Sequence, residues 1–418
     1  MKIVIKNRRR ERIFADLSIP RKSKGLAVIV PGIGGNVDQP LLLRAAKAFS
    51  EFTLLRFDPT NNAGKSDGTL EKATTTGFIQ DLEDVVVWAK KQKWYCEPFI
   101  LIGHSLGGLV CLIYSERHPR QIKALALLAP AVSGKLSLSK YSKKDIAAYK
   151  KRGYEERFDR MRKKMIRLPW SHMQDRLKYD AIKGAKHLTM PVSIIVGTKD
   201  KRTSAQHHRM LLNKLKGQKE LTVIPGASHN FDNHQAELSL TLKRWAQVYS
   251  DELIDVVDKN DRVLGTATKG FCHAKGLWHR SVAILIRNKA GDIVTQIRAK
   301  GKLGAGLLDN SASGHIPTGE SYRTAAMREL REELGISCRL QRIAKLRENT
   351  RMYGPHIKHI WELYTGVHNG PYHYQRSELA GIKLLTLEEL QSLIKTKPSS
   401  LCEGFKQDIR AYARWKKG

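Results

Sequence analysis

The stretch Gly103-His104-Ser105-Leu106-Gly107-Gly108 follows the apolar run 99–102 and precedes residues 106–117, which have the apolar spacing of a helix. This order predicts a strand, a sharp turn and a helix. The glycines of the stretch permit the tight turn and a close approach of the helix to the strand. Such a turn leaves the Ser105 hydroxyl exposed at the edge of a sheet, where a serine can act as a nucleophile.

Two further side chains are spaced as partners for such a serine. A serine hydroxyl is a weak nucleophile until a histidine takes its proton and a carboxylate orients that histidine. Asp200 follows the apolar run 192–196, and His229 follows the run 221–224. Each is therefore expected in a loop just beyond a strand end, and Ser105, Asp200 and His229 come in the order nucleophile, acid, base. The alternative is a chance glycine-rich turn.

The first 250 residues alternate apolar runs with amphipathic helical stretches such as 77–92, which predicts a parallel α/β sheet. Segment 135–185 interrupts this alternation, and it is strongly basic, with 13 basic residues against four acids between positions 135 and 167. We expect it to form consecutive helices that lie over the sheet. The expected strands are 26–30, 53–57, 99–102, 124–128, 192–196 and 221–224.

Residues 1–249 resemble an α/β-hydrolase and are most similar to the esterase and serine-peptidase-like branch. The stretch Arg56-Phe57-Asp58, followed by Gly64-Lys65-Ser66-Asp67-Gly68, is similar to a loop of that family. The resemblance implies a doubly wound sheet with 135–185 as a helical lid, an ester, thioester or amide substrate, and no cofactor in this domain. A decayed site that serves as a binding scaffold stays open. The implied roles are Ser105 as nucleophile, Asp200 as acid, His229 as base, and the amides of Ile33 and Leu106 as the oxyanion hole.

A second domain is expected over residues 251–418, because a hairpin-rich α+β pattern starts near 249–252. In it, residues 314–336 read Gly-x5-Glu-x7-Arg-Glu-Leu-Arg-Glu-Glu-Leu-Gly-Ile. Residues 321–334 predict a helix that places Glu329, Glu332 and Glu333 on one face, at positions i, i+3 and i+4. Carboxylates so close repel one another unless a divalent cation lies among them. A solvated acidic helix face is the alternative.

This segment matches the Nudix signature at every fixed position, so the second domain is identified as a member of the Nudix family. The resemblance implies an α/β/α sandwich and hydrolysis of a small-molecule substrate that contains a diphosphate. It also implies Mg²⁺ or Mn²⁺ as cofactor, which activates the attacking water. The implied roles are Glu320, Glu329, Glu332 and Glu333 as metal ligands, Glu332 also as a catalytic residue, and Arg328 as the residue that orients the glutamates.

Within that family, residues 251–336 resemble the branch of the isopentenyl-diphosphate isomerases, through Leu277-Trp278-His279-Arg280 and the stretch 309–315. Isomerases of this branch have a cysteine where this chain has Ser313. They also have a downstream pair of glutamates, near Ile357 and His359 here. These departures favour hydrolysis, with isomerisation as the alternative. A histidine metal site is a further alternative to ordinary surface and core histidines; its candidates are His273, His279, His315 and His359.

The chain of 418 residues has a formal net charge of +34. This charge suits anionic substrates or nucleic acid, and a basic RNA-end-processing protein is the alternative function, although no RRM, KH or helix-turn-helix signature supports it. A general lysine bias with solvated helix faces is the favoured explanation of the charge, because the basic residues are interleaved with apolar ones at helical spacing. The five cysteines are scattered without a CxxC pair, which favours the reducing cytoplasm, and we expect no membrane span. Two hydrolases that act in sequence and a fusion of unrelated hydrolases both fit this organisation.

Overall fold

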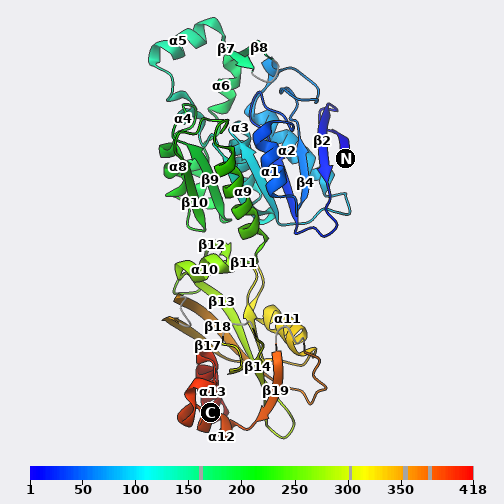
Figure 1. Cartoon of the computed structure of the whole chain (residues 1–418), viewed down its shortest axis with the longest axis vertical. Helices are drawn as coiled ribbons and strands as arrows, with labels where there is room; N and C mark the ends of the chain where they lie inside the picture. The colour runs from blue at the N-terminus through cyan, green and yellow to red at the C-terminus, as the bar shows by residue number, and fades with distance from the viewer. Residues whose placement is uncertain (160–162, 301–303, 352–355, 375–378, 418) are drawn as a thin grey trace. The chain divides into compact units, whose positions relative to one another are not determined.

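The computed structural model describes residues 1–159, 163–300, 304–351, 356–374 and 379–417. The chain divides into two compact units, Met1–Asp251 and Glu252–Gly418. Within the described ranges, no helix has both the length and the apolar composition that crossing a lipid bilayer requires. Each unit contains its own sheet and its own hydrophobic clusters, so each is described by itself (Figure 1).

The first unit is built on an eight-stranded sheet with the order β1-β2-β4-β3-β5-β6-β9-β10. Strands β4, β3, β5, β6, β9 and β10 run parallel to one another. Strands β1 and β2 form an antiparallel pair at one edge, with β2 antiparallel to β4. The apolar runs do not predict this edge pair, because each strand has only three consecutive apolar residues, flanked by charged ones. The bounds are β1 (Lys2–Lys6), β2 (Arg12–Ser18), β3 (Leu26–Val30), β4 (Thr53–Phe57), β5 (Phe99–His104), β6 (Ile122–Leu128), β9 (Val192–Gly197) and β10 (Lys219–Ile224).

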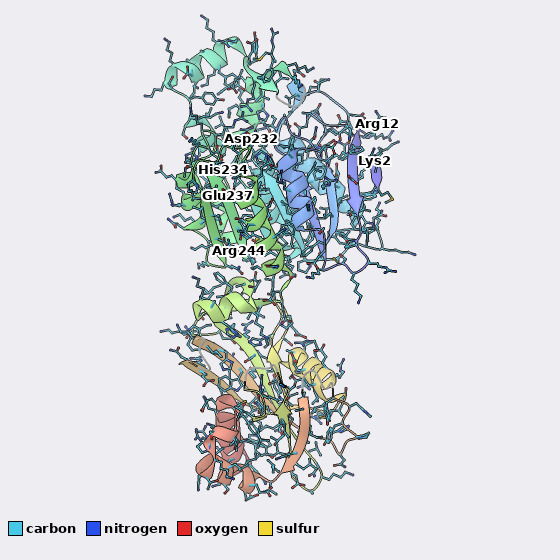
Figure 2. All side chains as sticks on the ribbon, viewed as in Figure 1. Lys2, Arg12, Asp232, His234, Glu237 and Arg244 are labelled. Carbon is cyan, nitrogen blue, oxygen red and sulfur yellow. The ribbon has the colours of Figure 1, made fainter. Side chains whose placement is uncertain are left out.

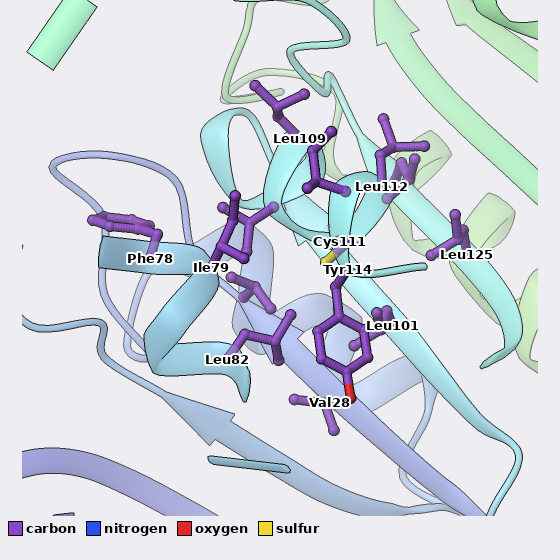
Figure 3. Close-up of a cluster of buried hydrophobic side chains, with 14 of the residues drawn as sticks. Val28, Phe78, Ile79, Leu82, Leu101, Leu109, Cys111, Leu112, Tyr114 and Leu125 are labelled. Carbon is purple, nitrogen blue, oxygen red and sulfur yellow. The ribbon is translucent and has the colours of Figure 1, made fainter. Parts of the chain in front are cut away.

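Helices cover both faces of this sheet. Successive residues of a strand point to opposite faces, so Leu101 of β5 packs on one side and Ile102 on the other. Figure 3 shows the first face, where Leu82 and Leu109 pack near Leu101. The predicted doubly wound sheet is confirmed. Its helices are α1 (Pro40–Ala48) and α9 (Gln235–Ser250) on one face, α2 (Thr75–Ala89) and α3 (Leu106–Arg117) on the other, α8 (Ala205–Leu212), and short 3-10 turns η1 (Leu70–Lys72), η2 (Pro119–Gln121) and η3 (Ala185–His187).

The lid segment differs from the expected run of helices, because it contains an antiparallel hairpin. Gly153 ends the preceding helix in the left-handed conformation, with φ of 79°. On the second strand of the hairpin, Ile166 and Leu168 are buried while Met165 and Arg167 are exposed, which is the two-residue period of a strand. The many charges obscure this period in the sequence. The bounds are α4 (Gly134–Leu138), α5 (Lys143–Arg152), β7 (Tyr154–Asp159), β8 (Lys164–Pro169), α6 (Trp170–Arg176) and α7 (Ala181–Gly184).

The second unit is a nine-stranded mixed sheet between two layers of helices. Its central pair is β13 and β18, which run parallel over ten residues. Helix α11 packs on one face through Leu330, and α13 packs on the other through Phe405 (Figure 1). The predicted α/β/α sandwich is confirmed. The strands are β11 (Leu253–Val257), β12 (Val263–Thr268), β13 (Trp278–Arg287), β14 (Ile293–Arg298), β15 (Leu308–Asp309), β16 (Ala312–His315), β17 (Gln341–Arg351), β18 (His356–Val367) and β19 (Leu379–Leu385). The helices are α10 (Lys269–Lys275), α11 (Tyr322–Leu334), α12 (Leu387–Thr396) and α13 (Glu403–Lys417), with the 3-10 turn η4 (Pro398–Ser400).

Two candidate active sites

Ser105 occupies a strained turn between β5 and α3. Its φ is +53°, a backbone conformation that side-chain-bearing residues rarely adopt. The turn needs glycine on both sides. A Cβ at Gly103 would lie 2.7 Å from the carbonyl oxygen of Gly107, and one at Gly107 would lie 2.3 Å from the carbonyl oxygen of Val30. The helix therefore approaches the strands closely, and Ser105 lies in the wall of a cavity of about 300 Å³.

The structure brings Ser105, Asp200 and His229 together from three separate segments. Nε2 of His229 lies 3.0 Å from Oγ of Ser105, and Nδ1 of His229 lies 2.8 Å from Oδ2 of Asp200. Asp200 also accepts hydrogen bonds from the amide of Arg202 and from the amide and hydroxyl of Thr203. The carboxylate is thus held in place by its own loop, and it orients the histidine toward the serine.

The charges of these groups suit proton transfer from the serine. Burial lowers the pKa of His229, and Asp200 opposes this effect without cancelling it. Burial works against ionisation of Asp200, but the hydrogen bond and charge of His229 lower its pKa to about 2. At neutral pH, therefore, His229 is neutral and able to accept a proton, and Asp200 is ionised and able to stabilise the imidazolium that forms.

The loop after β3 lies against the serine. A Cβ at Gly32 would lie 3.0 Å from Cβ of Ser105, and Ile33 lines the same cavity. Leu106 begins α3 directly after the serine. Asn62 braces this loop, because its Nδ2 donates to the carbonyl oxygens of Gly32 and Gly35 at 3.1 and 2.8 Å. Asn62 lies within the 56–68 loop, between Asp58 and Gly64, and no sequence motif marks it.

His104 adds a second support that the motif alone does not reveal. Its Nε2 lies 3.3 Å from the carbonyl oxygen of His229, and the two rings are 5.0 Å apart. Burial lowers the pKa of His104 to about 3, so it is neutral. Its Nδ1 finds no hydrogen-bond partner among the described residues. His104 therefore holds the loop of His229 against the turn that carries Ser105, and it stays uncharged.

In the second unit, α11 carries the acidic motif. Ser321 caps the start of the helix by accepting a hydrogen bond from the amide of Thr324, and Gly335 ends it with φ of +66°. Glu320 precedes the cap. The side chains of Glu329, Glu332 and Glu333 all line a cavity of about 730 Å³. The motif is thus placed on a helix that opens one side of its acidic face to a large pocket.

Arg328 is the centre of the acidic cluster. Its guanidinium lies 2.8 Å from Oε1 of Glu329, 2.9 Å from Oε2 of Glu332 and 3.1 Å from Oε2 of Glu320. Glu333 turns elsewhere, and its Oε2 accepts a hydrogen bond of 3.2 Å from the amide of Ser313. Three of the four predicted ligands therefore meet at the arginine, and the fourth is held by the strand β16.

The carboxylates fit a hard divalent cation by their chemistry. Burial, together with the charges of Glu332 and Glu252, raises the pKa of Glu329 to about 7, although Arg328 opposes the shift. A bound cation would relieve that crowding. The four glutamates do not form a preassembled cage. Over the ranges that the structure describes, they are absent from the groups whose ligand atoms converge within 4.8 Å.

The group that does converge is made of histidines. His273, His279 and His315 place their ligand atoms within 4.8 Å of one another. Nδ1 of His279 is directed at the carbonyl oxygen of Leu277, and its Nε2 has no hydrogen-bond partner in the described part of the chain. Burial, and then the neighbouring histidines, lower the pKa of His279 to about 3. Neutral imidazoles with a common focus are suitable ligands for a transition metal.

His359 does not join that group. Its Nδ1 lies 3.1 Å from Oγ of Ser281, and its Nε2 lies 3.1 Å from Oε2 of Glu348. Glu348 comes from the adjacent strand β17, directly opposite His359. No glutamate was expected in this region from positions 357 and 359, yet the pairing of β17 with β18 supplies one. No local sequence signal marks it, because the contact depends on the strand register.

Asp408 is a second acidic residue of this cavity that the sequence analysis missed. It comes from α13, and burial raises its pKa to about 7. It accepts hydrogen bonds from Nε1 of Trp361 at 2.8 Å and from Nδ2 of Asn310 at 2.9 Å. The cavity wall opposite α11 is therefore polar as well.

Sequence models of known families match both units. The alpha/beta hydrolase fold matches residues 27–169, and the NUDIX domain matches residues 277–401. A model of the PhoPQ-activated pathogenicity-related protein matches residues 136–253.

Relatives of the second unit include both isomerases and Nudix hydrolases. Isopentenyl-diphosphate Delta-isomerase 2 of Photorhabdus laumondii is 31% identical over 161 residues, which are 38% of this chain and 91% of that protein. An uncharacterized Nudix hydrolase of Pseudomonas aeruginosa is 36% identical over 149 residues, which are 34% of this chain and 85% of that protein.

Solved structures similar to the chain include esterases. Est1E of Butyrivibrio proteoclasticus with bound ferulic acid has a TM-score of 0.52 and 22% identity, and it covers 59% of this chain and 98% of its own. Mouse alpha/beta hydrolase domain-containing protein 10 has a TM-score of 0.50 and 17% identity, with the same coverage. At these identities the likeness establishes the fold alone. Through its second unit the chain belongs to the Nudix family, and with an α/β-hydrolase domain before it the protein is a two-domain hydrolase.

Proposed function

We propose that the first domain is a serine esterase or thioesterase, and that the second is a metal-dependent hydrolase of a substrate that contains a diphosphate. The hydrogen-bonded series Ser105, His229 and Asp200 carries the first proposal. The cluster of box glutamates around Arg328, in the wall of a large cavity, supports the second. We place both activities in the cytoplasm, because all five cysteines are free.

In the esterase reaction, Oγ of Ser105 attacks the carbonyl carbon of the substrate, and Nε2 of His229 takes the hydroxyl proton. The amides of Ile33 and Leu106 donate to the oxygen that becomes negative, a contribution of about 10²–10³-fold per donor in such sites. His229 then gives its proton to the departing alcohol or thiol, which leaves an acyl group on Ser105. Water attacks this acyl group with His229 again as base, and the acid is released.

A fluorophosphonate probe tests this proposal, because it reacts only with an activated serine. We expect labelling of the wild type and none of Ser105→Ala. The matched control is Ser239→Ala, since Ser239 is half-buried on α9, donates to the carbonyl oxygen of Gln235 and does not line the cavity of Ser105. This control should label as the wild type does. An unlabelled wild type, or equal labelling of Ser105→Ala, would refute the esterase proposal.

In the second domain, Glu320, Glu329, Glu332 and Glu333 would hold Mg²⁺ or Mn²⁺. When bound, such an ion neutralises phosphate charge and makes a water more acidic. Glu332 would accept the proton of the attacking water. Arg328 would keep the carboxylates in place through the ion pairs described above. Lys269 and Arg298 line the same cavity, where their charges suit phosphate oxygens.

This proposal is tested by Mg²⁺-dependent release of products from a panel of nucleoside diphosphate derivatives. Glu332→Gln should lose at least about 100-fold in kcat, because general acid–base groups contribute 10²–10⁴-fold. Glu388→Gln is the control, since Glu388 lies in the first turn of α12 and does not line the cavity. Turnover of no diphosphate in the panel, or full activity of Glu332→Gln, would contradict the proposal.

Isomerisation is the second candidate function, favoured by the converging histidines and by relatives that are isopentenyl-diphosphate isomerases. Ser313 argues against it, because a serine hydroxyl is a far weaker acid than a thiol and does not ionise near neutral pH. Incubation with isopentenyl diphosphate distinguishes the two. We expect phosphate release and no dimethylallyl diphosphate. Accumulation of dimethylallyl diphosphate, abolished in His279→Gln, would replace the hydrolase proposal by the isomerase one.

A further inference from the structure

The cavity over Ser105 has a basic rim built from two separate segments. Arg157 enters from the hairpin strand β7, and Lys199, Lys201 and Arg202 come from the loop that follows β9. Among the described residues that line this cavity, Asp232 is the one carboxylate. Figure 2 labels Asp232 just before α9, at the end of the unit where the lid segment lies. The rim therefore carries an excess of positive charge next to the nucleophile.

Arg157 is set into the structure more firmly than an ordinary surface cation. Its side chain is only 19% exposed, and it lies 3.3 Å from Glu155. That carboxylate is shared, because the hydroxyl of Tyr141 donates to it at 2.8 Å. Arg176 is buried in the same region, and its Nε has no hydrogen-bond partner in the described part of the chain. The single charge of Glu155 therefore does not balance the positive charges of both Arg157 and Arg176.

The excess charge reaches the catalytic histidine. After burial, the largest effect, the charges of Arg202 and Arg157 help to lower the pKa of His229. Partial removal of water, followed by the repulsion of Arg157, lowers the pKa of Lys140 to about 8. Arg157 and Arg202, which come from different segments, therefore both act on His229, and all three residues line the cavity. A chain that is basic over its whole surface does not by itself produce such a focus.

We propose that the ester cleaved at Ser105 carries a negatively charged group, a carboxylate or a phosphate, which binds between Arg157 and the basic loop 199–202. This inference rests on the proposed esterase activity and names its substrate class. A guanidinium pairs with carboxylate and phosphate oxygens in a two-pronged geometry, which suits both groups. The other cavity walls include Leu70, Ile166 and Leu168, which would accept the hydrocarbon part of a small substrate.

The experiment compares matched pairs of esters on the full chain. In the acyl arm, 4-nitrophenyl hydrogen glutarate is paired with the neutral 4-nitrophenyl pentanoate. In the leaving-group arm, 4-acetoxybenzoate and 4-acetoxyphenyl phosphate are each paired with 4-acetoxybenzamide. Rates are divided by those of uncatalysed alkaline hydrolysis. We expect at least one charged ester to exceed its neutral partner about tenfold in kcat/KM, a factor typical of one hydrogen bond to a charged group. Added salt should reduce this preference.

Variants assign the preference to the rim. Arg157→Gln should lower the charged-to-neutral ratio at least about fivefold, and Arg157→Lys should restore part of it. The control is Arg167→Gln on the neighbouring strand β8, because Arg167 is 65% exposed and does not line the cavity. That variant should keep the ratio of the wild type.

The failures of the two proposals are distinguishable. If every neutral ester is hydrolysed in a Ser105-dependent way but no charged ester is preferred, the esterase stands and the anionic substrate is overturned. The anionic substrate is also overturned if the double variant Arg157→Gln/Lys201→Gln keeps the charged-to-neutral ratio of the wild type. If no ester is hydrolysed and no fluorophosphonate label appears, both proposals fail.

Discussion

A Cβ atom at Gly314 would lie 1.9 Å from Oε1 of Glu329. Gly314, the first glycine of the Nudix signature, therefore leaves the space that the carboxylate of Glu329 occupies. We predict that Gly314→Ala displaces this carboxylate and lowers diphosphate hydrolysis at least about tenfold, as small misplacements of catalytic groups do. The clash involves the end of a flexible side chain, so the thermal unfolding temperature should change little.

Gly381→Ala is the control for that variant. Gly381 lies on β19, and within the described ranges a Cβ there would meet only Cδ1 of Ile297 at 3.8 Å, an ordinary contact. Its activity should match the wild type. Full activity of Gly314→Ala would show that the position of Glu329 does not matter for the reaction.

The two active sites should differ in their need for metal. The reaction proposed for the first site uses the Ser105, His229 and Asp200 side chains and backbone amides, whereas the glutamates of the second are proposed metal ligands. Treatment with EDTA followed by gel filtration should abolish diphosphate hydrolysis and leave ester hydrolysis within a factor of about two, because no step of serine catalysis uses a cation. Readdition of Mg²⁺ should restore diphosphate hydrolysis. Parallel loss of both activities would contradict the assignment.

The acid limb of ester hydrolysis should report His229. The reaction needs the neutral imidazole, and burial lowers the pKa of His229 below its usual value of about 6.5. For a neutral ester, kcat/KM should therefore stay high as pH falls through 6.5 and decline only below it. Because the charge of Arg157 contributes to the lowering, Arg157→Gln should move the limb to higher pH. A limb above pH 6.5 in the wild type, or a shift to lower pH in the variant, would contradict this electrostatic account.

The stability of the first unit should depend on the face that α2 and α3 cover. Leu101 is fully buried there, between β5 and the helices (Figure 3). Leu101→Ala should cost about 2–5 kcal/mol, the range observed for buried leucines. Leu240 is 72% exposed on α9, so Leu240→Ala should stay within about 0.5 kcal/mol of the wild type. Urea unfolding is monitored by the loss of fluorophosphonate labelling at Ser105, which reports on the first unit separately from the second. Equal effects of both variants would contradict the packing.

Local patterns were sufficient for the central part of the first unit. Strands β3 and β4 begin and end at the residues that the apolar runs predict, as does the helix after Ser105. Each of these elements is built mainly from buried apolar residues, so it can be recognised in a short stretch of sequence. The lid hairpin was not predictable in this way, because charged residues hide the alternation of Ile166 and Leu168.

Chain order and helical spacing are enough to predict which residue types stand at the strand ends and that three glutamates share one face of a helix. The contacts of those side chains depend on how the whole unit folds. Arg328 gathers Glu320 and Glu329 in ion pairs, Glu348 reaches His359 through the strand register, and Arg157 reaches the Ser105 cavity from the lid. Such contacts join residues that lie far apart in the chain, and packing of the whole unit selects them.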